Sequence, residues 1–157
     1  MKCEAGISAD KLYRYTLSRV WDESLPLLGW IGYNPSIADG SIDDPSVRRM
    51  MTFSADSRHG GLLLGNLHGL ISTDPKQLLN HPDPIGPNNL AAWTSIKNQC
   101  PHVVAAWGAA GLGTPQSLKA IEMFPALWCL GTTKHGAPRH PLYIKSSQPL
   151  VRFRRRP

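Results

Sequence analysis

The chain of 157 residues fits a single domain, and its 41% of hydrophobic residues predict a globular fold with a core that needs no disulfide or metal. No stretch approaches about 18 consecutive apolar residues, and the first residues lack the apolar segment of a secretory signal. We therefore expect no membrane span and a cytoplasmic location. The three cysteines are widely spaced with no CxxC pair, which disfavours a cysteine metal site and is typical of reduced thiols.

The excess of positive charge is concentrated at the C-terminus. Lys and Arg total 17 against 11 Asp and Glu, a net charge of +6, and four arginines lie in the last six residues. Without these four, 13 cationic side chains would face 11 acidic ones, a net charge of +2. We therefore expect one domain over 1–151 and a basic tail over 152–157. Such a tail suits a DNA or RNA partner, and a tail that only aids solubility explains the charge equally well.

Hydrophobic patterns in the first third of the chain predict two strands and a helix. Alternation around 13–17 indicates an early strand, and the apolar run 27–33 indicates a buried strand that ends in a turn. Asp44 and Pro45 are typical of an N-cap and a first helical position, so they predict a helix over 46–53.

The rest of the chain alternates between short apolar runs and helical patterns. Strands are expected at 61–67, 102–107 and 127–130, and helices over 74–79, 88–99 and 115–124. This spacing of βα units predicts an α/β fold, a three-layer α/β/α sandwich with a short, mostly parallel sheet. No GxGxxG or P-loop pattern follows any strand, which disfavours ordinary dinucleotide or ATP binding.

Polar residues follow the predicted strand ends, where α/β sheets bind their ligands. Asn34 lies in a rigid turn, where its amide can orient a water or bind a ligand, or simply cap its own turn. Asn66 ends an apolar strand and offers a donor and an acceptor to the edge of a nucleobase, unless it is a satisfied structural amide. His68, two positions later, is a weaker candidate.

The segment 134–141 is the densest cluster of cationic and imidazole side chains. Lys134, His135, Arg139 and His140 share a loop rich in Gly and Pro, which suits binding of an anion or stabilisation of developing negative charge. A polar surface loop is the alternative. The two histidines lack an obvious third ligand, so we expect no metal.

Several motifs resemble an uncharacterised bacterial and phage family, domain of unknown function 1643. The family's LNPSTAD, DDPT-RR and PRHPLYL motifs correspond here to YNPSIAD at 33–39, DDPSVRR at 43–49 and PRHPLYI at 138–144. Order and spacing match over about residues 10–151. This resemblance implies membership of the family and no particular activity.

A more distant resemblance is to the uracil-DNA glycosylase superfamily. That superfamily has a strand ending in GxNPG or GQDPYH, a later strand ending in Asn, and a final HPSPL loop. Here the matching segments are GYNPS at 32–36, LLLGNL at 62–67 and HPL at 140–142. The resemblance implies a three-layer α/β/α sandwich that hydrolyses the N-glycosidic bond of a base, with no cofactor.

The resemblance also implies roles for the matching residues. Asn34 would position the hydrolytic water, Asn66 would bind the Watson–Crick edge of a flipped base, and His140 would donate to the departing base. The expected catalytic residues are Asn34 and His140. The expected substrate contacts are Gly32, Tyr33, Pro35, Ser36, Phe53 (by stacking), Asn66, His68 and Arg139, and the expected phosphate or nucleic-acid contacts are Arg48, Arg49, Lys134, His135, Arg154 and Arg155.

The leading hypothesis is therefore excision of uracil or a modified pyrimidine from DNA or a nucleotide. Two other classes stay open. A non-catalytic protein would bind a nucleotide or modified base in the same crevice. A structural or inhibitory phage protein would meet nucleic acid or a host enzyme through its basic face, and would depend on 152–156 rather than on Asn34.

Overall fold

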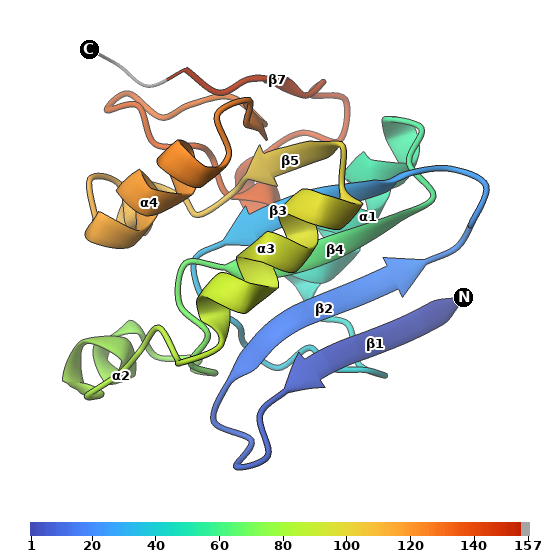
Figure 1. Ribbon diagram of the computed structural model, residues 1–157. Helices are drawn as coiled ribbons and strands as arrows, with labels where there is room; N and C mark the ends of the chain where they lie inside the picture. The colour runs from blue at the N-terminus through green and yellow to red at the C-terminus, as the bar shows by residue number, and fades with distance from the viewer. Residues whose placement is uncertain (155–157) are drawn as a thin grey trace.

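The computed structural model describes residues 1–154, and a seven-stranded sheet runs through its centre (Figure 1). The strands are β1 (Lys2–Ile7), β2 (Arg14–Val20), β3 (Leu27–Gly32), β4 (Gly61–Asn66), β5 (His102–Ala105), β6 (Trp128–Cys129) and β7 (Val151–Arg152), in the order β1-β2-β4-β3-β5-β6-β7. The helices are α1 (Pro45–Asp56), α2 (Pro75–Asn80), α3 (Asn89–Gln99) and α4 (Pro115–Met123), with short 3-10 turns η1 (Ala109–Gly111) and η2 (Pro141–Tyr143).

The sheet is mixed, whereas the sequence predicted a mostly parallel one. The pairings β4–β3, β3–β5 and β5–β6 are parallel, and β1–β2, β2–β4 and β6–β7 are antiparallel. The short connection from β1 to β2 makes a hairpin, whose strands must run antiparallel. Sequence analysis missed β1 because its side chains are mostly exposed and carry no apolar alternation. It missed β7 because that strand is two residues long and exposed.

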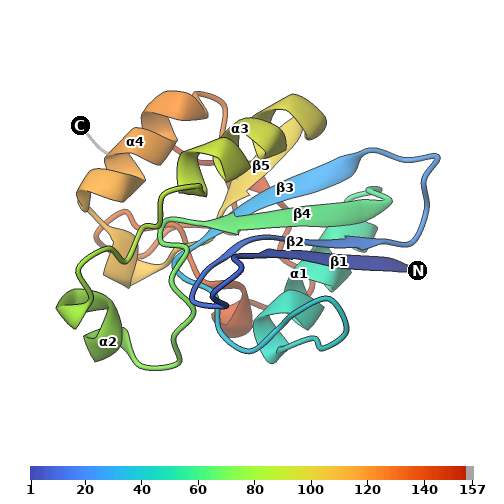
Figure 2. The same ribbon diagram turned by 60° about the horizontal axis from the view of Figure 1, so that its bottom comes forward.

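Helices cover both faces of the sheet, α1 on one and α3 and α4 on the other (Figures 1 and 2). The α1 face buries a core of Leu17, Leu28, Trp30, Ala38, Val47, Met50, Phe53, Leu62, Leu64, Val104, Ala106 and Leu130. The α3 and α4 face buries a second core that includes Ile31, Leu67, Trp93, Ile96, Val103, Ala120 and Phe124. Each large apolar side chain buried this way contributes about 1.5–3 kcal/mol.

The start of α1 follows from its local sequence, as predicted. The Asp44 side chain accepts a hydrogen bond from the Val47 N–H at 2.8 Å, and Pro45 occupies the first turn, where no N–H is needed. The helix continues to Asp56, three residues beyond the predicted end. This cap matters for function because Asp44 also lines the cavity described below.

The C-terminal residues that the structure describes lie against the sheet. Arg152, in β7, has its guanidinium 5.0 Å from the ring of Trp128, and the Phe153 ring packs on Trp107 at 5.8 Å. The boundary expected between the domain (1–151) and the basic tail (152–157) thus falls within β7. Arg155, the remaining nucleic-acid contact expected in the tail, lies outside the described residues. Within 1–154, no helix is both long and apolar enough to cross a membrane.

Candidate functional site

A cavity of about 550 Å³ opens at the carboxyl ends of β3 and β4 and beside the segment that follows β5. Asn34, Asn66 and His140 all line it. Of the other expected substrate contacts, Gly32, Tyr33 and Ser36 line it as well. Its volume is in the range of cavities that bind small organic ligands.

Strand pairing explains how segments distant in sequence converge on this cavity. Strands β3 and β4 run parallel with Gly32 opposite Asn66, so their polar ends leave the sheet side by side. Strand β5 pairs with the other edge of β3 and leads into Gly108. The Gly108 N–H donates to the Pro138 carbonyl at 2.9 Å, which attaches the loop carrying His140 to this end of the sheet.

The side chain of Asn34 is oriented by two backbone carbonyls. Its Nδ2 donates to the carbonyls of Pro35 at 3.0 Å and Ser72 at 2.9 Å. Because both partners accept, the nitrogen and the oxygen of this amide are assigned without ambiguity. Within the described chain Oδ1 has no hydrogen-bond partner, so it is available to accept from a water or a ligand. An amide oxygen can orient a water, but it is too weak a base to deprotonate one.

Asn66 presents an unsatisfied donor. Its side chain is only 4% exposed, and Nδ2 has no hydrogen-bond partner among the described residues. The backbone carbonyl of Asn66 accepts from Trp93 Nε1 at 2.9 Å and Asn89 Nδ2 at 3.0 Å, which fixes the end of β4 against α3. A buried donor without an acceptor costs about 1–3 kcal/mol, so a ligand acceptor would recover that energy.

Gly32 is required beside this amide. A Cβ at position 32 would lie 2.6 Å from Oδ1 of Asn66, a distance that Cβ atoms essentially never show, so the amide would have to move. Gly32, two residues before Asn34, therefore makes room for the Asn66 side chain at the end of the neighbouring strand. Sequence analysis predicted Gly32 as a substrate contact, and the structure adds this second requirement.

The imidazole of His140 is held as a neutral donor. The Leu142 N–H donates to Nδ1 at 3.2 Å, so that nitrogen carries no proton and the neutral ring carries its hydrogen on Nε2. Burial lowers the pKa of His140 below its ordinary value, and the nearby Asp44 carboxylate opposes this shift. At pH 7 the side chain is therefore neutral, with an N–H available for a ligand oxygen.

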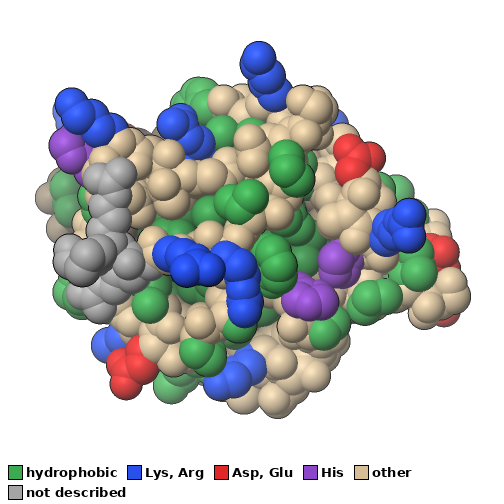
Figure 3. Space-filling model, turned by 90° about the horizontal axis from the view of Figure 1, so that it is seen from above, with side chains coloured by type: hydrophobic (Ala, Val, Ile, Leu, Met, Phe, Trp, Pro, Cys, Tyr) green, Lys and Arg blue, Asp and Glu red, His purple; other side chains and the backbone are tan. Residues whose placement is uncertain are grey.

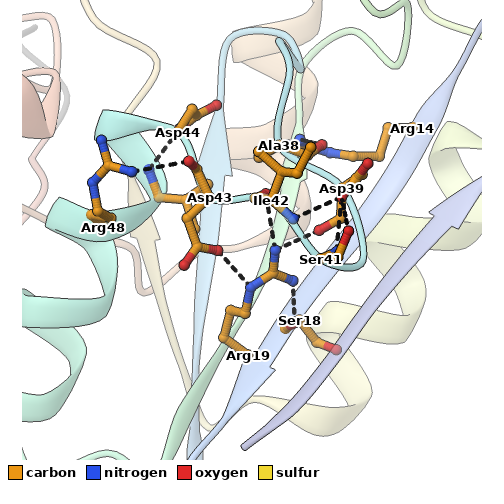
Figure 4. Close-up of polar contacts among 11 residues, drawn as sticks. Arg14, Ser18, Arg19, Ala38, Asp39, Ser41, Ile42, Asp43, Asp44 and Arg48 are labelled. Atoms are coloured by element: carbon orange, nitrogen blue, oxygen red, sulfur yellow. Dashed lines mark hydrogen bonds and ion pairs between the residues drawn. The ribbon is translucent and has the colours of Figure 1, made fainter.

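Arg14 lines the cavity and was missed by sequence analysis. The side chain is 2% exposed; Nη1 donates to the Ala38 carbonyl at 2.6 Å, and Nε has no partner within residues 1–154 (Figure 4). Burial lowers the pKa of Arg14 to about 10, and Asp44 opposes this shift, so the guanidinium is charged at pH 7. The signal available in the sequence was an arginine between Tyr13 and Tyr15, in the alternating segment that predicted a strand.

Four expected substrate contacts lie outside the cavity: Phe53, Pro35, His68 and, on the surface, Arg139. Phe53 does not stack on a cavity ligand, because it is 3% exposed in the α1 core beneath the Arg49 guanidinium, 5.0 Å from its ring. Pro35 is buried and contributes its carbonyl to Asn34. His68 packs its ring edge-on against Tyr33 at 4.9 Å, and burial lowers its pKa.

The expected phosphate contacts also lie outside the cavity, as far as the structure describes them. Arg49 donates to Ile144 O, to Ser146 Oγ at 2.9 Å and to Pro141 O at 3.4 Å, so it holds the segment after His140 rather than an anion. Arg48 is exposed and donates to the Asp43 carbonyl at 3.0 Å.

The other cationic candidates are on the surface. Arg139 is exposed, with Nε donating to the Thr132 carbonyl at 3.1 Å. Lys134, His135 and Arg154 are exposed too. The face of the molecule above β7 carries Lys and Arg side chains with few acidic ones (Figure 3). Among residues 1–154, no three His, Cys, Asp or Glu side chains gather as a metal site requires.

These features define a mixed α/β protein with a small-ligand cavity at its strand ends, lined by two amides, a neutral imidazole and a buried guanidinium. A family model described as "Protein of unknown function (DUF1643)" matches residues 14–142, and the chain belongs to this family. Neither curated proteins nor solved structures give a significant match.

Proposed function

We propose that the cavity binds a nucleobase and that the protein hydrolyses its N-glycosidic bond in DNA. The observation that carries the proposal is that Asn34, Asn66 and His140 line one cavity, and that each has a polar side-chain atom without a hydrogen-bond partner among the described residues. Those atoms are an acceptor, a donor and a second donor. A pyrimidine with its two carbonyl oxygens and a water beside its sugar would use all three.

In the proposed reaction the bond between the base nitrogen and C1′ breaks, and its electron pair stays with the base. The Nε2–H of His140 donates to the base carbonyl that carries this charge, while Nδ2 of Asn66 donates to the opposite carbonyl. A water held by Asn34 Oδ1 adds to the electron-poor C1′ and releases its proton to solvent. Because Asn34 cannot take that proton, the water must attack after the bond has largely broken.

The fold proposed to carry this chemistry is the sandwich of the uracil-DNA glycosylase superfamily. Its four parallel strands would be β4, β3, β5 and β6, with α1 on one face and α3 and α4 on the other. The antiparallel strands would be additions at the two edges. The exposed cations of Figure 3 would contact the phosphate backbone, which accounts for affinity without sequence preference.

A panel of oligonucleotides tests the proposal. Each strand carries uracil, 5-hydroxymethyluracil or another modified pyrimidine, and abasic sites are measured as strand breaks after alkali. We expect release of at least one base, and at least about a tenfold loss in Asn34→Ala and in His140→Ala, since one stabilising donor is commonly worth 10²–10³ in rate. The control His102→Ala, at an exposed site outside the cavity, should retain activity. Full activity in both cavity variants would show that the roles are wrong.

Binding without catalysis is the second candidate. It is favoured because the described part of the chain lines the cavity with no free carboxylate that could act as a general base. Asp44 supplies the one carboxylate that lines the cavity within the described residues, and its Oδ1 is committed to capping α1. A pure binder would show saturable, Asn66-dependent binding of a base or nucleotide, with no abasic product from any strand in the panel.

A further inference from the structure

Strand β2 buries two arginines, and their hydrogen bonding differs. Arg19 is 1% exposed; its Nε pairs with the Asp43 carboxylate at 2.7 Å, and its Nη atoms donate to the carbonyls of Ser18, Asp39 and Ile42 (Figure 4). Arg14 is about equally buried, yet its side chain makes one hydrogen bond within the described chain, to the Ala38 carbonyl. Arg19 therefore has a carboxylate in direct contact, whereas Arg14 has none among residues 1–154, and Asp44 and Asp39 act on its charge only from farther away.

An unpaired buried charge is costly, which makes Arg14 informative. Removing an ion from water costs several kcal/mol unless a counter-charge compensates it. The carboxylate that shares the cavity with Arg14, Asp44, forms no ion pair with it in the described structure and caps α1 instead. Within residues 1–154, Arg14 thus brings to the lining of the cavity a positive charge without a carboxylate in contact and an Nε donor without an acceptor.

The strand order places Arg14 relative to the proposed base contacts. Arg14 begins β2, which is next to β4, and β4 ends in Asn66. His140 lies near Gly108, after β5, on the other side of β3. A base bound to Asn66 with one carbonyl at His140 would therefore turn its opposite side toward Arg14.

We propose that Arg14 binds an oxyanion, a carboxylate or a phosphate group, carried by the ligand of this cavity. The proposal rests on the proposed function in taking Asn66 as the base contact. The anion would be a substituent of the pyrimidine ring or the 5′-phosphate of a free nucleotide. A guanidinium matches both, because its planar fork donates two parallel hydrogen bonds to either group. The hydroxyl side chains of Ser36 and Thr73 line the same cavity and offer further donors, whereas the Ser72 hydroxyl already donates to the Asp74 carbonyl at 2.7 Å.

Two pairs of probes distinguish these sources. Uracil is compared with 5-carboxyuracil, and deoxyuridine with deoxyuridine 5′-monophosphate, by isothermal titration calorimetry on the full chain. We expect the anionic member of one pair to bind at least about tenfold more tightly than its neutral partner, a difference of about 1.4 kcal/mol. A gain in the first pair identifies a ring substituent, and a gain in the second identifies the nucleotide phosphate.

Variants then assign the gain to Arg14. Arg14→Gln should abolish it while leaving affinity for the neutral probe within about threefold, and Arg14→Lys, which keeps the charge without the fork, should retain part of it. Lys97→Gln removes the same charge from an exposed position on α3 and should change nothing. Melting curves for each variant establish that it is folded, and Arg14→Lys carries the test if Arg14→Gln is not.

The proposal is refuted if neither anionic probe binds more tightly than its neutral partner, or if the full gain survives in folded Arg14→Gln. Where Arg14→Lys carries the test, an undiminished gain in that variant refutes it. Either result leaves the oligonucleotide assay free to support base excision on its own. Conversely, an Arg14-dependent gain in a protein that releases no base from any strand would uphold this anion site and reject the glycosylase activity.

Discussion

Replacing Arg19 by methionine tests whether a buried ion pair organises one wall of the cavity. The guanidinium links β2 to the loop between β3 and α1, through the Asp43 carboxylate and the carbonyls of Asp39 and Ile42 (Figure 4). The same loop carries Ser36 and ends at the α1 cap. Methionine fills a similar volume but provides no donor, so these acceptors lose their partner.

The magnitude follows from burial. Removing one partner of a buried ion pair costs about 3–5 kcal/mol. Asp43 is 31% exposed and regains water once its partner is gone, which places the expected loss near the lower end, about 3 kcal/mol. For a chain of this length each kcal/mol shifts the melting temperature by about 2–4 °C, so we expect a decrease of roughly 6–12 °C.

Thermal unfolding followed by circular dichroism measures this decrease. Lys2→Met is the matched control, because Lys2 forms an ion pair with Glu23 in which both side chains are about two-thirds exposed or more. Ion pairs this exposed contribute little because solvent screens them, so that variant should melt within about 3 °C of the parent. If Arg19→Met were no less stable than Lys2→Met, burial would not govern the strength of this contact.

Three further predictions concern the cavity, the histidines and the cysteines. Gly32→Ala overpacks the Asn66 amide and should cost about 1–3 kcal/mol by denaturant titration. Gly40→Ala, whose added Cβ would meet only the Ala5 nitrogen at 3.9 Å, should be near neutral, and equal effects would contradict the clash. Burial lowers the pKa of three histidines below the ordinary 6.5, namely His59, His68 and His140. The unfolded chain then binds their protons first, so stability should be full above about pH 6.5 and fall as the pH drops toward the folded pKa values; a melting temperature that rises from pH 7.5 to 5 would reverse this sign. Burial raises the pKa of Cys100 to about 12, so mass spectrometry after iodoacetamide at pH 8 should find the exposed Cys3 modified and Cys100 intact until the chain is unfolded.

Much of the fold could be predicted because the signals are local. Apolar runs mark β3, β4 and β5 within one or two residues, and the Asp-Pro pair marks the start of α1. Local patterns could not reveal β1, an exposed strand defined by its pairing with β2. They also predicted a mostly parallel sheet, since a βα spacing carries no information about the hairpin at one edge and β7 at the other.

The candidate site divides in the same way. The sequence by itself determined that Asn34 and Asn66 follow predicted strands and that His140 lies in a loop rich in Gly and Pro. A turn motif and an amide in an apolar run can both be recognised within a few residues, and a buried amide requires hydrogen-bond partners. Only the tertiary structure decided that they share one cavity, that Arg14 joins them, and that Arg49 holds a backbone segment rather than phosphate. These outcomes depend on contacts between residues tens of positions apart, and whether a charged side chain is paired, buried or exposed is set by neighbours that the local sequence does not contain.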